Sequence, residues 1–583
     1  MNNKMLLKVI RPSNKKGFST IEIWQNTAWR SKSILAIFIA AFFIVVCRAF
    51  YLQFLNVETW QKKAEEKYTK YVDIPGVRGK ILDRNGEILA SSVLNYKVGI
   101  VPKLFSPTSV DIERLKNLLG LDNSRLLGPV FSERYFRLPR SINEKTVENI
   151  KELRLTGLEF EPVYERDYPF RQAFSTLIGL TSIDDDKGIE GIEKAFDHYL
   201  RGKPGQKKLL VERGNIAFDE KVVLNPEPGR DIKLTVDAGI QSIVYREASA
   251  AKKRYDAKSV SVVLLDARNG DILSIVNVPS ADPINRRSLN LDEVRNRAIT
   301  DQFEPGSTLK PFAIAAALEA GVVDSRTIIE TTPGFIKVNG KKLQDERSFG
   351  KLSVKDVLAK SSNVGTVKIA LQLQSNEMYH YLNLLGFGKT PDLPLLGLRT
   401  GTLPKWKDWE KINQATISYG YGVDVTLIQL ARAYTVFTKA GYILPVKISD
   451  VDRGGTKSPI FSMTVVEEMK EMLVKATSKN GTGREARVPG YTVAGKTGTT
   501  RKIENGKYST NKYIASFVGF APSENPRFIA AIRVDEPKKH KTGGKVAAPI
   551  FSKIAASALR DFQMSPNPKD QIIPKTAMSY SSE

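Results

Sequence analysis

The sequence has few of the side chains that bind metals or form cross-links. Cys47 is the single cysteine among 583 residues, so no disulfide can form within the chain. The three histidines, His198, His380 and His540, lie far apart in the sequence. Zinc sites are built from clustered Cys and His ligands. The sequence therefore predicts no zinc centre.

Acidic side chains are also in short supply. The chain carries 88 Lys and Arg residues against 63 Asp and Glu residues, a formal net charge of +25. It has no zinc-finger spacing, no aromatic-plus-basic RNA motif and no long Lys/Arg block, so nucleic-acid binding is not indicated. The excess charge fits a mildly basic solvated surface. It also fits attraction to acidic lipid headgroups or to an anionic wall polymer.

The overall composition is that of a folded protein. Hydrophobic residues make up 42% of the chain and charged residues 26%, which is typical of globular domains and not of disordered chains. A chain of 583 residues is too long for one hydrophobic core, and its length predicts about three or four units.

One apolar segment is long enough to be a candidate membrane span. Residues 34–47 are continuously apolar, and the pattern continues past Arg48, which can extend its charged group to the interface. Residues 33–55 match the length of about 20 residues that a span needs. No small-residue cleavage site follows, and Cys47 follows a valine where a lipoprotein signal needs a small residue. We predict an uncleaved anchor, with the basic residues 1–32 in the cytoplasm.

Two Asn-Gly turns predict hairpins in two separate domains. They lie within residues 80–89 and 262–273, and Asn-Gly tolerates the backbone angles of tight hairpin turns. We place the domain boundary near residue 230. Strands at both ends of the later segment, with helices between them, predict one sheet assembled from both ends. The predicted strands are 234–237, 492–494, 514–520 and 528–534, and the predicted helices are 238–253, 311–320, 354–360, 364–373 and 549–562.

A serine and a lysine are spaced for nucleophilic catalysis near the predicted helix 311–320. If a helix begins at Ser307, Lys310 lies on the same face, and the free N–H groups of the helix start can stabilise an oxyanion. A lysine that burial or a neighbouring cation keeps neutral can take the serine proton. The same spacing occurs at four other serines, but only Ser307 precedes a buried helix. Those four are Ser13, Ser249, Ser348 and Ser509.

Two further polar motifs follow. Ser361-Ser362-Asn363 lies between two predicted helices, where a serine can relay protons and an asparagine can hold a substrate amide. Lys496-Thr497-Gly498-Thr499 follows a predicted strand and offers a cation for a carboxylate and a glycine for close approach. A second Lys-Thr-Gly, at 541–543, follows a charged stretch, and we predict that it is a solvated loop.

Taken in order, Ser-x-x-Lys, Ser-x-Asn and Lys-Thr-Gly are the signatures of penicillin-binding proteins and serine β-lactamases. Over roughly residues 30–562 the chain resembles class B penicillin-binding proteins, and it is closest to their septal, FtsI-like branch. Further stretches that carry the resemblance are 48–53, 78–79, 83–86, 188–193, 295–298, 303–311, 418–422 and 495–499.

The resemblance implies the fold and its division into domains. It implies an α/β (α+β) transpeptidase domain like that of serine β-lactamases, with an antiparallel sheet flanked by helices, at 231–562. An elongated, mixed α+β pedestal of the dimerisation type, without catalytic function, is implied at 56–230. One N-terminal transmembrane helix precedes it. The polar tail at 563–583 is expected to be mobile.

The resemblance also implies the reaction. Ser307 attacks the penultimate D-Ala carbonyl of a peptidoglycan stem peptide, with Lys310 as base, and the terminal D-Ala leaves. An amine of a neighbouring stem then resolves the acyl-enzyme into a cross-link, and β-lactams acylate the same serine. No metal or organic cofactor is implied. The implied site residues are Ser307, Lys310, Ser361 and Asn363, then Lys496, Thr497, Gly498 and Thr499, with the N–H groups of Ser307 and Thr499 as the oxyanion hole.

Location and partners follow from the same resemblance. The implied location is the bacterial inner membrane at the division septum, with one span, a cytoplasmic N-terminus and a periplasmic catalytic domain. The implied partners are a polytopic septal glycosyltransferase and other membrane proteins of the division complex. An elongation-type transpeptidase, a non-catalytic β-lactam-binding scaffold or sensor, and a soluble β-lactamase or carboxypeptidase are the alternatives. Intact Ser307, Lys310 and Lys496 argue against a scaffold, and the anchor and pedestal argue against a soluble enzyme.

Two positions depart from the family pattern. Thr500 stands where an alanine usually follows Lys-Thr-Gly-Thr, which we expect to alter β-lactam affinity. Ser175 stands where a histidine often precedes the Ile-Gly pair, here Ile178 and Gly179. Because Ser175 lies in the predicted pedestal, we expect it to leave catalysis unaffected.

Overall fold

The structure is a computed structural model that describes residues 20–121, 135–183, 185–211, 217–285, 289–451, 457–504 and 506–567. It divides into two compact units. The first comprises residues 1–74 with 204–225, and the second comprises residues 75–203 with 226–583. The predicted cytoplasmic tail up to residue 19, and the predicted mobile tail from residue 568, lie outside the described residues.

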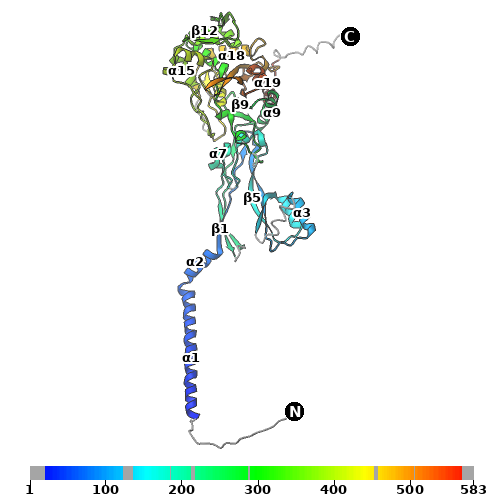
Figure 1. The fold of residues 1–583 in the computed structure, drawn as a ribbon, viewed down its shortest axis with the longest axis vertical. Coiled ribbons are helices and arrows are strands. Elements are labelled where there is room, and N and C mark those ends of the chain that lie inside the picture. Colours follow the sequence, from blue (N-terminus) through cyan, green and yellow to red (C-terminus); the bar gives the residue numbers. More distant parts are fainter. Residues whose placement is uncertain are drawn as a thin grey trace, which may run out of the picture. The chain divides into compact units, whose positions relative to one another are not determined.

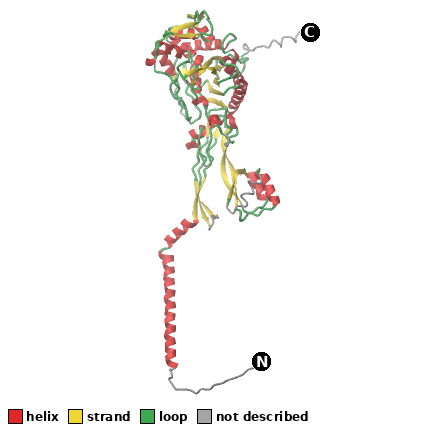
Figure 2. Ribbon diagram, viewed as in Figure 1, coloured by secondary structure: helices red, strands yellow, loops and turns green. Residues whose placement is uncertain are grey.

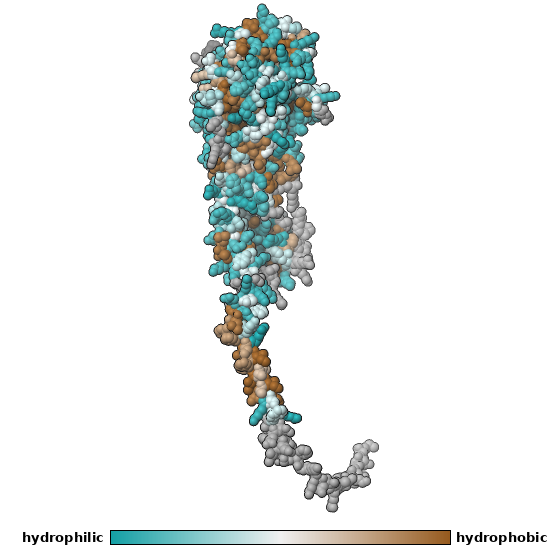
Figure 3. Space-filling model, turned by 90° about the vertical axis from the view of Figure 1, so that its left-hand side faces the viewer, coloured by the Kyte–Doolittle hydropathy of each residue, from teal (hydrophilic) through white to brown (hydrophobic). Residues whose placement is uncertain are grey.

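The first unit contains the predicted membrane anchor. Helix α1 (Thr20–Phe50) continues into a short π-helix (Tyr51–Leu55), and α2 (Val57–Tyr68) follows. Residues 29–55 are long and apolar enough to cross a membrane, and Figure 3 shows them as a band of hydrophobic side chains. Among the described residues this is the one helix long and apolar enough for a membrane span, which matches the predicted anchor. The unit also holds a three-stranded antiparallel sheet in the order β1-β6-β7, made of β1 (Thr69–Ile74), β6 (Gly205–Val211) and β7 (Ala217–Leu224).

The second unit begins with a mixed sheet built around the long strand β3 (Ile88–Ile100). The strand order is β4-β3-β2-β8, and β5 also pairs with β3. The predicted first hairpin is confirmed, because β2 and β3 are antiparallel and Gly86 has a φ of +91° in the turn between them. Helices α3 and α5 cover part of this sheet with a small core of their own. The other elements are β2 (Ile81–Leu82), α3 (Ser109–Leu119), β4 (Phe136–Asn143), α5 (Glu144–Glu152), β5 (Leu158–Asp167) and β8 (Ile232–Lys233).

A buried ionic cluster lies where the β3 sheet meets the short helices that follow it in the chain. The Arg78 Nε donates to Glu193 at 2.7 Å, and Arg166 donates to the same carboxylate at 2.7 Å. A second Arg78 nitrogen pairs with Asp197, also at 2.7 Å. Glu193 is fully buried, so each cation offsets a charge that would otherwise be costly to desolvate. The cluster joins the sheet to short helices whose bounds are η2 (Arg171–Ala173), α6 (Ser175–Ile178), α7 (Gly191–Ala195) and α8 (Asp197–Leu200).

The larger part of the second unit is built on a five-stranded antiparallel sheet in the order β10-β9-β19-β18-β17 (Figure 2). Strands from both ends of the segment meet in it, which confirms the predicted arrangement. Every residue of β9 and β19 is buried, because helices cover both faces of the sheet. The strands are β9 (Ser259–Asp266), β10 (Ile272–Val278), β17 (Ala494–Glu504), β18 (Lys507–Ala521) and β19 (Phe528–Asp535).

The two faces of this sheet belong to two hydrophobic cores. Val262 on β9 packs in one core with α9 (Ala238–Tyr255) and α19 (Gly543–Asp561), which Figure 1 labels beside β9. The next residue, Val263, packs in the other core with the helices of the opposite layer. This alternation is the period-two pattern of a strand. The opposite layer holds α12 (Lys310–Glu319), α13 (Val354–Lys360), α14 (Asn363–Ala370), α15 (Ser375–Leu384), α16 (Lys411–Ser418), α17 (Leu427–Ala433) and α18 (Met463–Thr477).

Short elements complete the unit. The helical ones are α10 (Leu291–Val294), α11 (Arg297–Thr300), η4 (Gly306–Thr308), η5 (Trp406–Asp408), η6 (Tyr434–Phe437) and η7 (Arg484–Ala486). The paired strands are β11 (Ile328–Glu330) with β14 (Lys351–Ser353), β12 (Phe335–Val338) with β13 (Lys341–Gln344), and β15 (Tyr442–Ile443) with β16 (Ser458–Pro459).

Four predicted boundaries were wrong. The helix does not begin at Ser307, because residues 306–308 form a 3₁₀ turn and α12 begins at Lys310. The predicted strand 492–494 is displaced, since β17 begins at Ala494 and contains the motif itself. The strand expected at 234–237 is not formed, because β8 ends at Lys233. The closing helix begins at Gly543, not at residue 549: Pro549 lies inside it and removes only one main-chain hydrogen bond.

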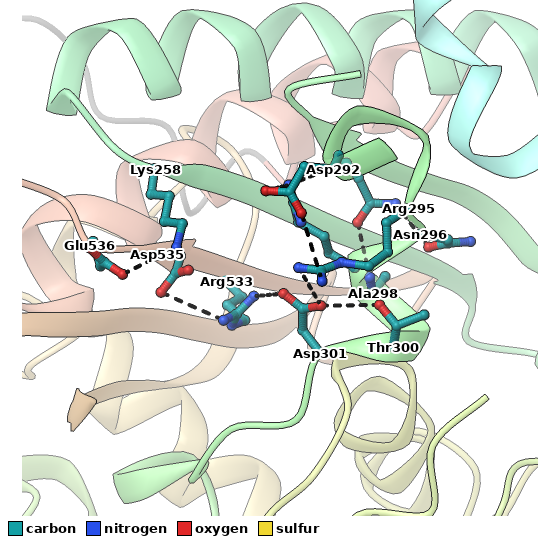
Figure 4. Close-up of polar contacts among 12 residues, drawn as sticks. Lys258, Asp292, Arg295, Asn296, Ala298, Thr300, Asp301, Arg533, Asp535 and Glu536 are labelled. Carbon is teal, nitrogen blue, oxygen red and sulfur yellow. Dashed lines mark hydrogen bonds and ion pairs between the residues drawn. The ribbon is translucent and has the colours of Figure 1, made fainter. Parts of the chain in front are cut away.

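A polar network fixes the segment 295–301, which leads into the Ser307 turn (Figure 4). Arg533 on β19 pairs with Asp301 at 3.3 Å, and only 5% of the Arg533 side chain is exposed. Asn277 on β10 accepts a hydrogen bond from the Ala298 N–H at 2.9 Å. Side chains of two strands of the sheet therefore hold the middle and the end of this segment, which precedes the turn.

Candidate active site

The three predicted motifs meet in one cavity of about 420 Å³. Ser307 comes from η4, Ser361 and Asn363 from the junction of α13 and α14, and Thr497 and Thr499 from β17. The remaining lining residues are Asp345, Glu346, Phe349, Lys360, Tyr421, Gly481, Thr482, Arg484, Glu485, Thr542, Gly544 and Lys545.

Tight backbone contacts fix the turn that carries Ser307. Gly306 has a φ of +56°, and its N–H donates to the Gly420 carbonyl at 3.0 Å. A Cβ on Gly306 would lie 2.5 Å from the Thr500 methyl group, so only glycine fits at this position against β17. Ser307 is half-buried and faces the cavity. Thr500, which stands where the family usually has alanine, therefore packs against the turn that carries Ser307.

Lys310 is fully buried behind Ser361. Its Nζ donates to the Ser361 carbonyl at 2.5 Å, to the Ser361 Oγ at 3.2 Å and to the Asn363 Oδ1 at 2.8 Å. Burial holds the pKa of Lys310 well below its ordinary value, and the nearby charge of Lys496 lowers it further. Burial thus favours the neutral form of this amine, which lies behind the Ser361 and Asn363 side chains that line the cavity.

Lys496 reaches the same serine from the opposite side. Its Nζ donates to the Ser361 Oγ at 3.0 Å and to the Thr497 carbonyl at 3.1 Å. Burial lowers the pKa of Lys496 to about 7. Because the Ser361 hydroxyl lies between two amines with lowered pKa values, it can pass a proton between them.

Asp345 fixes the Ser361 junction, and sequence reasoning missed it. Its carboxylate accepts from the Ser362 hydroxyl at 2.6 Å, from the Val364 N–H at 3.1 Å and from the Asn363 N–H. Ser361 itself has a φ of +60°, which such a clamp helps to maintain. Asp345 follows β13 and has no sequence motif around it, so only a knowledge of long-range contacts could have found it.

The wall formed by β17 has two sides. Thr497 and Thr499 line the cavity, and the Thr497 hydroxyl donates to Thr482 at 3.1 Å. Gly498 lies behind this wall: a Cβ there would be 2.3 Å from the Ser516 Oγ and 2.9 Å from the Pro305 carbonyl. The glycine at this position therefore allows β17 to pack against the turn that carries Ser307.

The second Lys-Thr-Gly is not simply the solvated loop that we predicted. Thr542 and Gly544 line the cavity, and the Gly543 N–H donates to the Thr499 hydroxyl at 3.0 Å. A Cβ on Gly543 would lie 2.4 Å from the Gly498 carbonyl. The prediction was wrong because a polar stretch of sequence does not reveal that α19 begins against β17.

Glu304 links the turn that carries Ser307 to the loop 418–422 and to strand β18. Its carboxylate accepts from the Gly422 N–H at 2.8 Å and from the Tyr508 hydroxyl at 3.0 Å. Burial raises the pKa of Glu304. The Gly422 contact explains why the loop 418–422 is near the site, because Tyr421 of that loop lines the cavity.

The arrangement can support acyl transfer without a bound group. It offers the Ser307 and Ser361 hydroxyls, a buried amine with a lowered pKa and a second amine whose pKa is about 7. Among the described residues, no group of three or more His, Cys, Asp or Glu side chains is placed to hold a metal ion. The combination matches a covalent mechanism with an activated serine.

Two family descriptions match the chain. The penicillin binding protein transpeptidase domain matches residues 260–556, and the penicillin-binding protein dimerisation domain matches residues 73–234. The first match covers about half of the chain and contains every motif that meets in the cavity.

Individual relatives match over almost the full length. The probable peptidoglycan D,D-transpeptidase PenA of Neisseria meningitidis is 37% identical over 530 residues, which are 90% of this chain and 91% of the relative. The peptidoglycan D,D-transpeptidase FtsI of Escherichia coli is 32% identical over 550 residues, 93% of each chain. A solved transpeptidase domain of Burkholderia pseudomallei penicillin-binding protein 3 is 39% identical, with a TM-score of 0.53, and covers 57% of this chain and 97% of its own.

Proposed function

Because the chain belongs to the class B penicillin-binding protein family, we propose that it cross-links peptidoglycan through an acyl-enzyme on Ser307. It is a peptidoglycan D,D-transpeptidase and a target of β-lactams, as the transpeptidase domain and the named relatives indicate. The observation that supports the residue roles is the position of the Ser361 hydroxyl between the Lys310 and Lys496 amines, in the cavity that Ser307 also lines.

Acylation begins when Ser307 attacks the carbonyl of the penultimate D-Ala. The neutral Lys310 amine takes the Ser307 proton, for which its lowered pKa prepares it. The N–H groups of Ser307 and Thr499 stabilise the oxyanion. Ser361 passes a proton toward the nitrogen of the departing D-Ala, while Asn363 holds the peptide amide.

The terminal carboxylate of the donor binds on the β17 side. Lys496 in its protonated form supplies the charge, and the Thr497 and Thr499 hydroxyls line the cavity beside it. A β-lactam carries a carboxylate at the corresponding place, so the same groups orient it. After D-Ala leaves, the amine of a second stem attacks the Ser307 ester and completes the cross-link.

The cellular location is proposed from the relative named FtsI. The FtsI relative of Escherichia coli favours work at the septum, with the N-terminus in the cytoplasm, the catalytic domain in the periplasm, and a polytopic glycosyltransferase of the division complex as partner. We divide the chain into a pedestal at 56–230 and a transpeptidase domain at 231–562. An elongation-type enzyme would have the same chemistry in a different complex.

Intact-protein mass spectrometry after exposure to benzylpenicillin tests the assignment. The wild type should gain one persistent adduct that peptide mapping places on Ser307, and the Ser307→Ala variant should gain none. Ser509→Ala, which removes a serine of the same Ser-x-x-Lys spacing, should behave as the wild type. A folded wild-type protein without an adduct would reject the transpeptidase assignment. Rapid penicillin hydrolysis through a transient adduct would show a β-lactamase instead.

A further inference from the structure

A second hollow of the catalytic region is lined mainly by aromatic side chains. Its volume is about 550 Å³, and it lies between helix α15, the short helix η5 and the end of α12. The aromatic lining residues are Tyr379, His380, Tyr381 and Trp406. We call this site the aromatic hollow, and its lining residues differ from those of the active-site cavity.

Two of these rings are held in place by packing. Tyr379 meets Trp409 edge to face, with ring centres 6.0 Å apart, and the Trp409 Nε1 donates to the Pro404 carbonyl at 3.0 Å. Tyr381 stacks on Phe461, which is buried, with ring centres 5.4 Å apart. The rings are therefore ordered before a ligand arrives, and binding costs little side-chain entropy.

The aromatic hollow combines an apolar surface with free hydrogen-bonding groups. Trp406 is 39% exposed, although η5 packs against α15. The hydroxyls of Tyr379 and Tyr381 and the amides of Asn376 and Asn383 make no side-chain hydrogen bond within the described part of the chain. Such side chains offer a ligand both an apolar ring face and a polar tip.

Charge contributes little to this surface. Among the described lining residues there is one acid, Glu377, and no lysine or arginine. Glu377 already accepts from the Gln374 N–H at 3.0 Å, where it caps α15. The rest of the chain is strongly basic, with a net charge of +25, so the hollow differs from its surroundings. It suits a neutral polar ligand better than an anionic peptide or polymer.

The substrate of the proposed reaction carries such a component. The stems of peptidoglycan are attached to glycan strands of N-acetylated sugars. Each sugar ring has a C–H face that can pack on an aromatic ring, and its hydroxyl and acetamide groups can bond to Tyr and Asn side chains. We propose that the aromatic hollow is a binding site for the glycan strand of peptidoglycan, with Trp406 as its main contact. The inference rests on the proposed function and names a second part of the same substrate.

A glycan contact would act on substrate affinity. Helix α15 packs against α12, the helix that follows the Ser307 turn, so the hollow and the nucleophile belong to one layer of the fold. A strand held at the hollow raises the local concentration of its own stems near the cavity. The contact therefore favours stems on a polymer over free stem peptides.

Titration with a peptide-free sugar tests the proposal. The full-length protein, in a detergent without a sugar headgroup, would be titrated with tetra-N-acetylchitotetraose, a neutral oligomer of N-acetylglucosamine, and followed by calorimetry. The wild type should bind it, and Trp406→Ala should weaken binding by about tenfold. Trp406→Phe, which keeps an apolar ring, and Asn376→Ala, which removes one amide, should each weaken it by about threefold. Tyr442→Ala is the matched control, since Tyr442 is a similarly exposed aromatic outside the hollow, and it should bind as the wild type does.

The possible outcomes separate the site from the proposed reaction. Equal affinity in the wild type and a folded Trp406→Ala, or an equal loss in Tyr442→Ala, would overturn the aromatic hollow as the binding site. A wild type that forms the penicillin adduct on Ser307 but does not bind the oligomer would overturn this inference alone. A wild type that binds the oligomer through Trp406 but forms no adduct would support the sugar site and overturn the proposed function. Thermal unfolding of each variant shows whether it is folded.

Discussion

At the scale of single residues, the site depends on two amines that are buried without a carboxylate partner. Among the described residues, neither Lys310 nor Lys496 forms an ion pair, and burial lowers the pKa of both. Buried uncompensated charge is costly, so both side chains favour the neutral state in the empty site. The chemistry thus exploits an arrangement that opposes stability.

The rate of penicillin acylation should depend on the titration of Lys496. Because a lysine is charged below its pKa, the cation that attracts the β-lactam carboxylate should be lost as pH rises through about 7. The second-order rate constant for acylation should therefore fall between about pH 7 and pH 9. Lys496→Arg, whose cation persists, should lack this fall, and a wild-type rate that stays flat over this range would contradict the role of Lys496 as the titrating cation.

Removing the same amine should make the protein more stable. In the folded state the pKa of Lys496 is lowered, so at neutral pH and above the unfolded chain binds more protons, and folding works against this group. Lys496→Met should raise the free energy of unfolding by about 1–3 kcal/mol at pH 7 while abolishing penicillin acylation. Denaturant unfolding checks the first effect, and an unchanged or lowered stability would refute it.

Asp345 should affect catalysis because it holds the segment that carries Ser361 and Asn363. Asp345→Asn weakens three hydrogen bonds that hold the Ser361 junction. We expect penicillin acylation to slow by about tenfold to a hundredfold, with a loss of about 1–3 kcal/mol in stability. Asp356→Asn is a matched control, since Asp356 lies in the first turn of α13, where its carboxylate accepts from the Ser353 hydroxyl and pairs with Lys475, and it does not line the cavity. Equal rates in the two variants would argue against the clamp.

At the scale of elements, the catalytic groups are held by contacts between backbones. Strand β17 packs on the Ser307 turn at Gly498, and the start of α19 packs on β17 at Gly543. These contacts form a stack of three elements in which any added side chain must displace its neighbour. The geometry of the cavity thus depends on the spacing between elements as much as on the motif residues.

A methyl group on Gly543 should disturb this stack. In Gly543→Ala the new Cβ would meet the Ser516 and Gly498 carbonyls at 2.3 and 2.4 Å, so α19 must shift away from β17. The shift would weaken the Gly543 N–H bond to Thr499, and acylation should slow by about tenfold or more. Gly239→Ala, in the exposed first turn of α9, should keep the wild-type rate. Stopped-flow acylation measures both.

How much the sequence predicts depends on how local each feature is. Ser307, Ser361 and Lys496 were predicted because each sits in a short motif. In the structure Ser307 and Ser361 line one cavity, and the buried Lys496 amine donates to the Ser361 hydroxyl. Asp345, Glu304 and Gly543 were missed because their roles arise from partners far away in the chain. The helix predicted at 311–320 matches α12 to within one residue, but the start considered at Ser307 was wrong, because a 3₁₀ turn and the first turn of a helix share the same sequence pattern.

At the scale of the whole molecule, the pedestal and the catalytic region differ in how they are held together. The region around Glu193 relies on a buried ionic cluster, whereas the catalytic sheet is buried between two hydrophobic cores. A cluster of this kind is sensitive to the loss of one partner, because the remaining charge is left without compensation.

Arg78→Ala should therefore be strongly destabilising. It leaves the buried Glu193 with one cation, and we expect a loss of about 3–5 kcal/mol in the free energy of unfolding. Arg137→Ala, which removes an exposed pair with Glu161, should cost less than about 1 kcal/mol. Calorimetry of both variants measures the difference. If Arg78→Ala melts as the wild type does, the cluster contributes nothing to stability.

The order of strands in the catalytic sheet also bears on how the protein is made. Val262 on β9 has Ile532 on β19 as its register partner, so the centre of the sheet joins an early and a late part of the chain. Pairings between residues so distant in sequence form slowly during folding. A growing chain that already contains Ser307 still lacks the strands that shape its cavity. The nascent protein is therefore inert toward both peptide and antibiotic until synthesis is nearly complete, and a premature stop codon anywhere before β19 yields no partial enzyme.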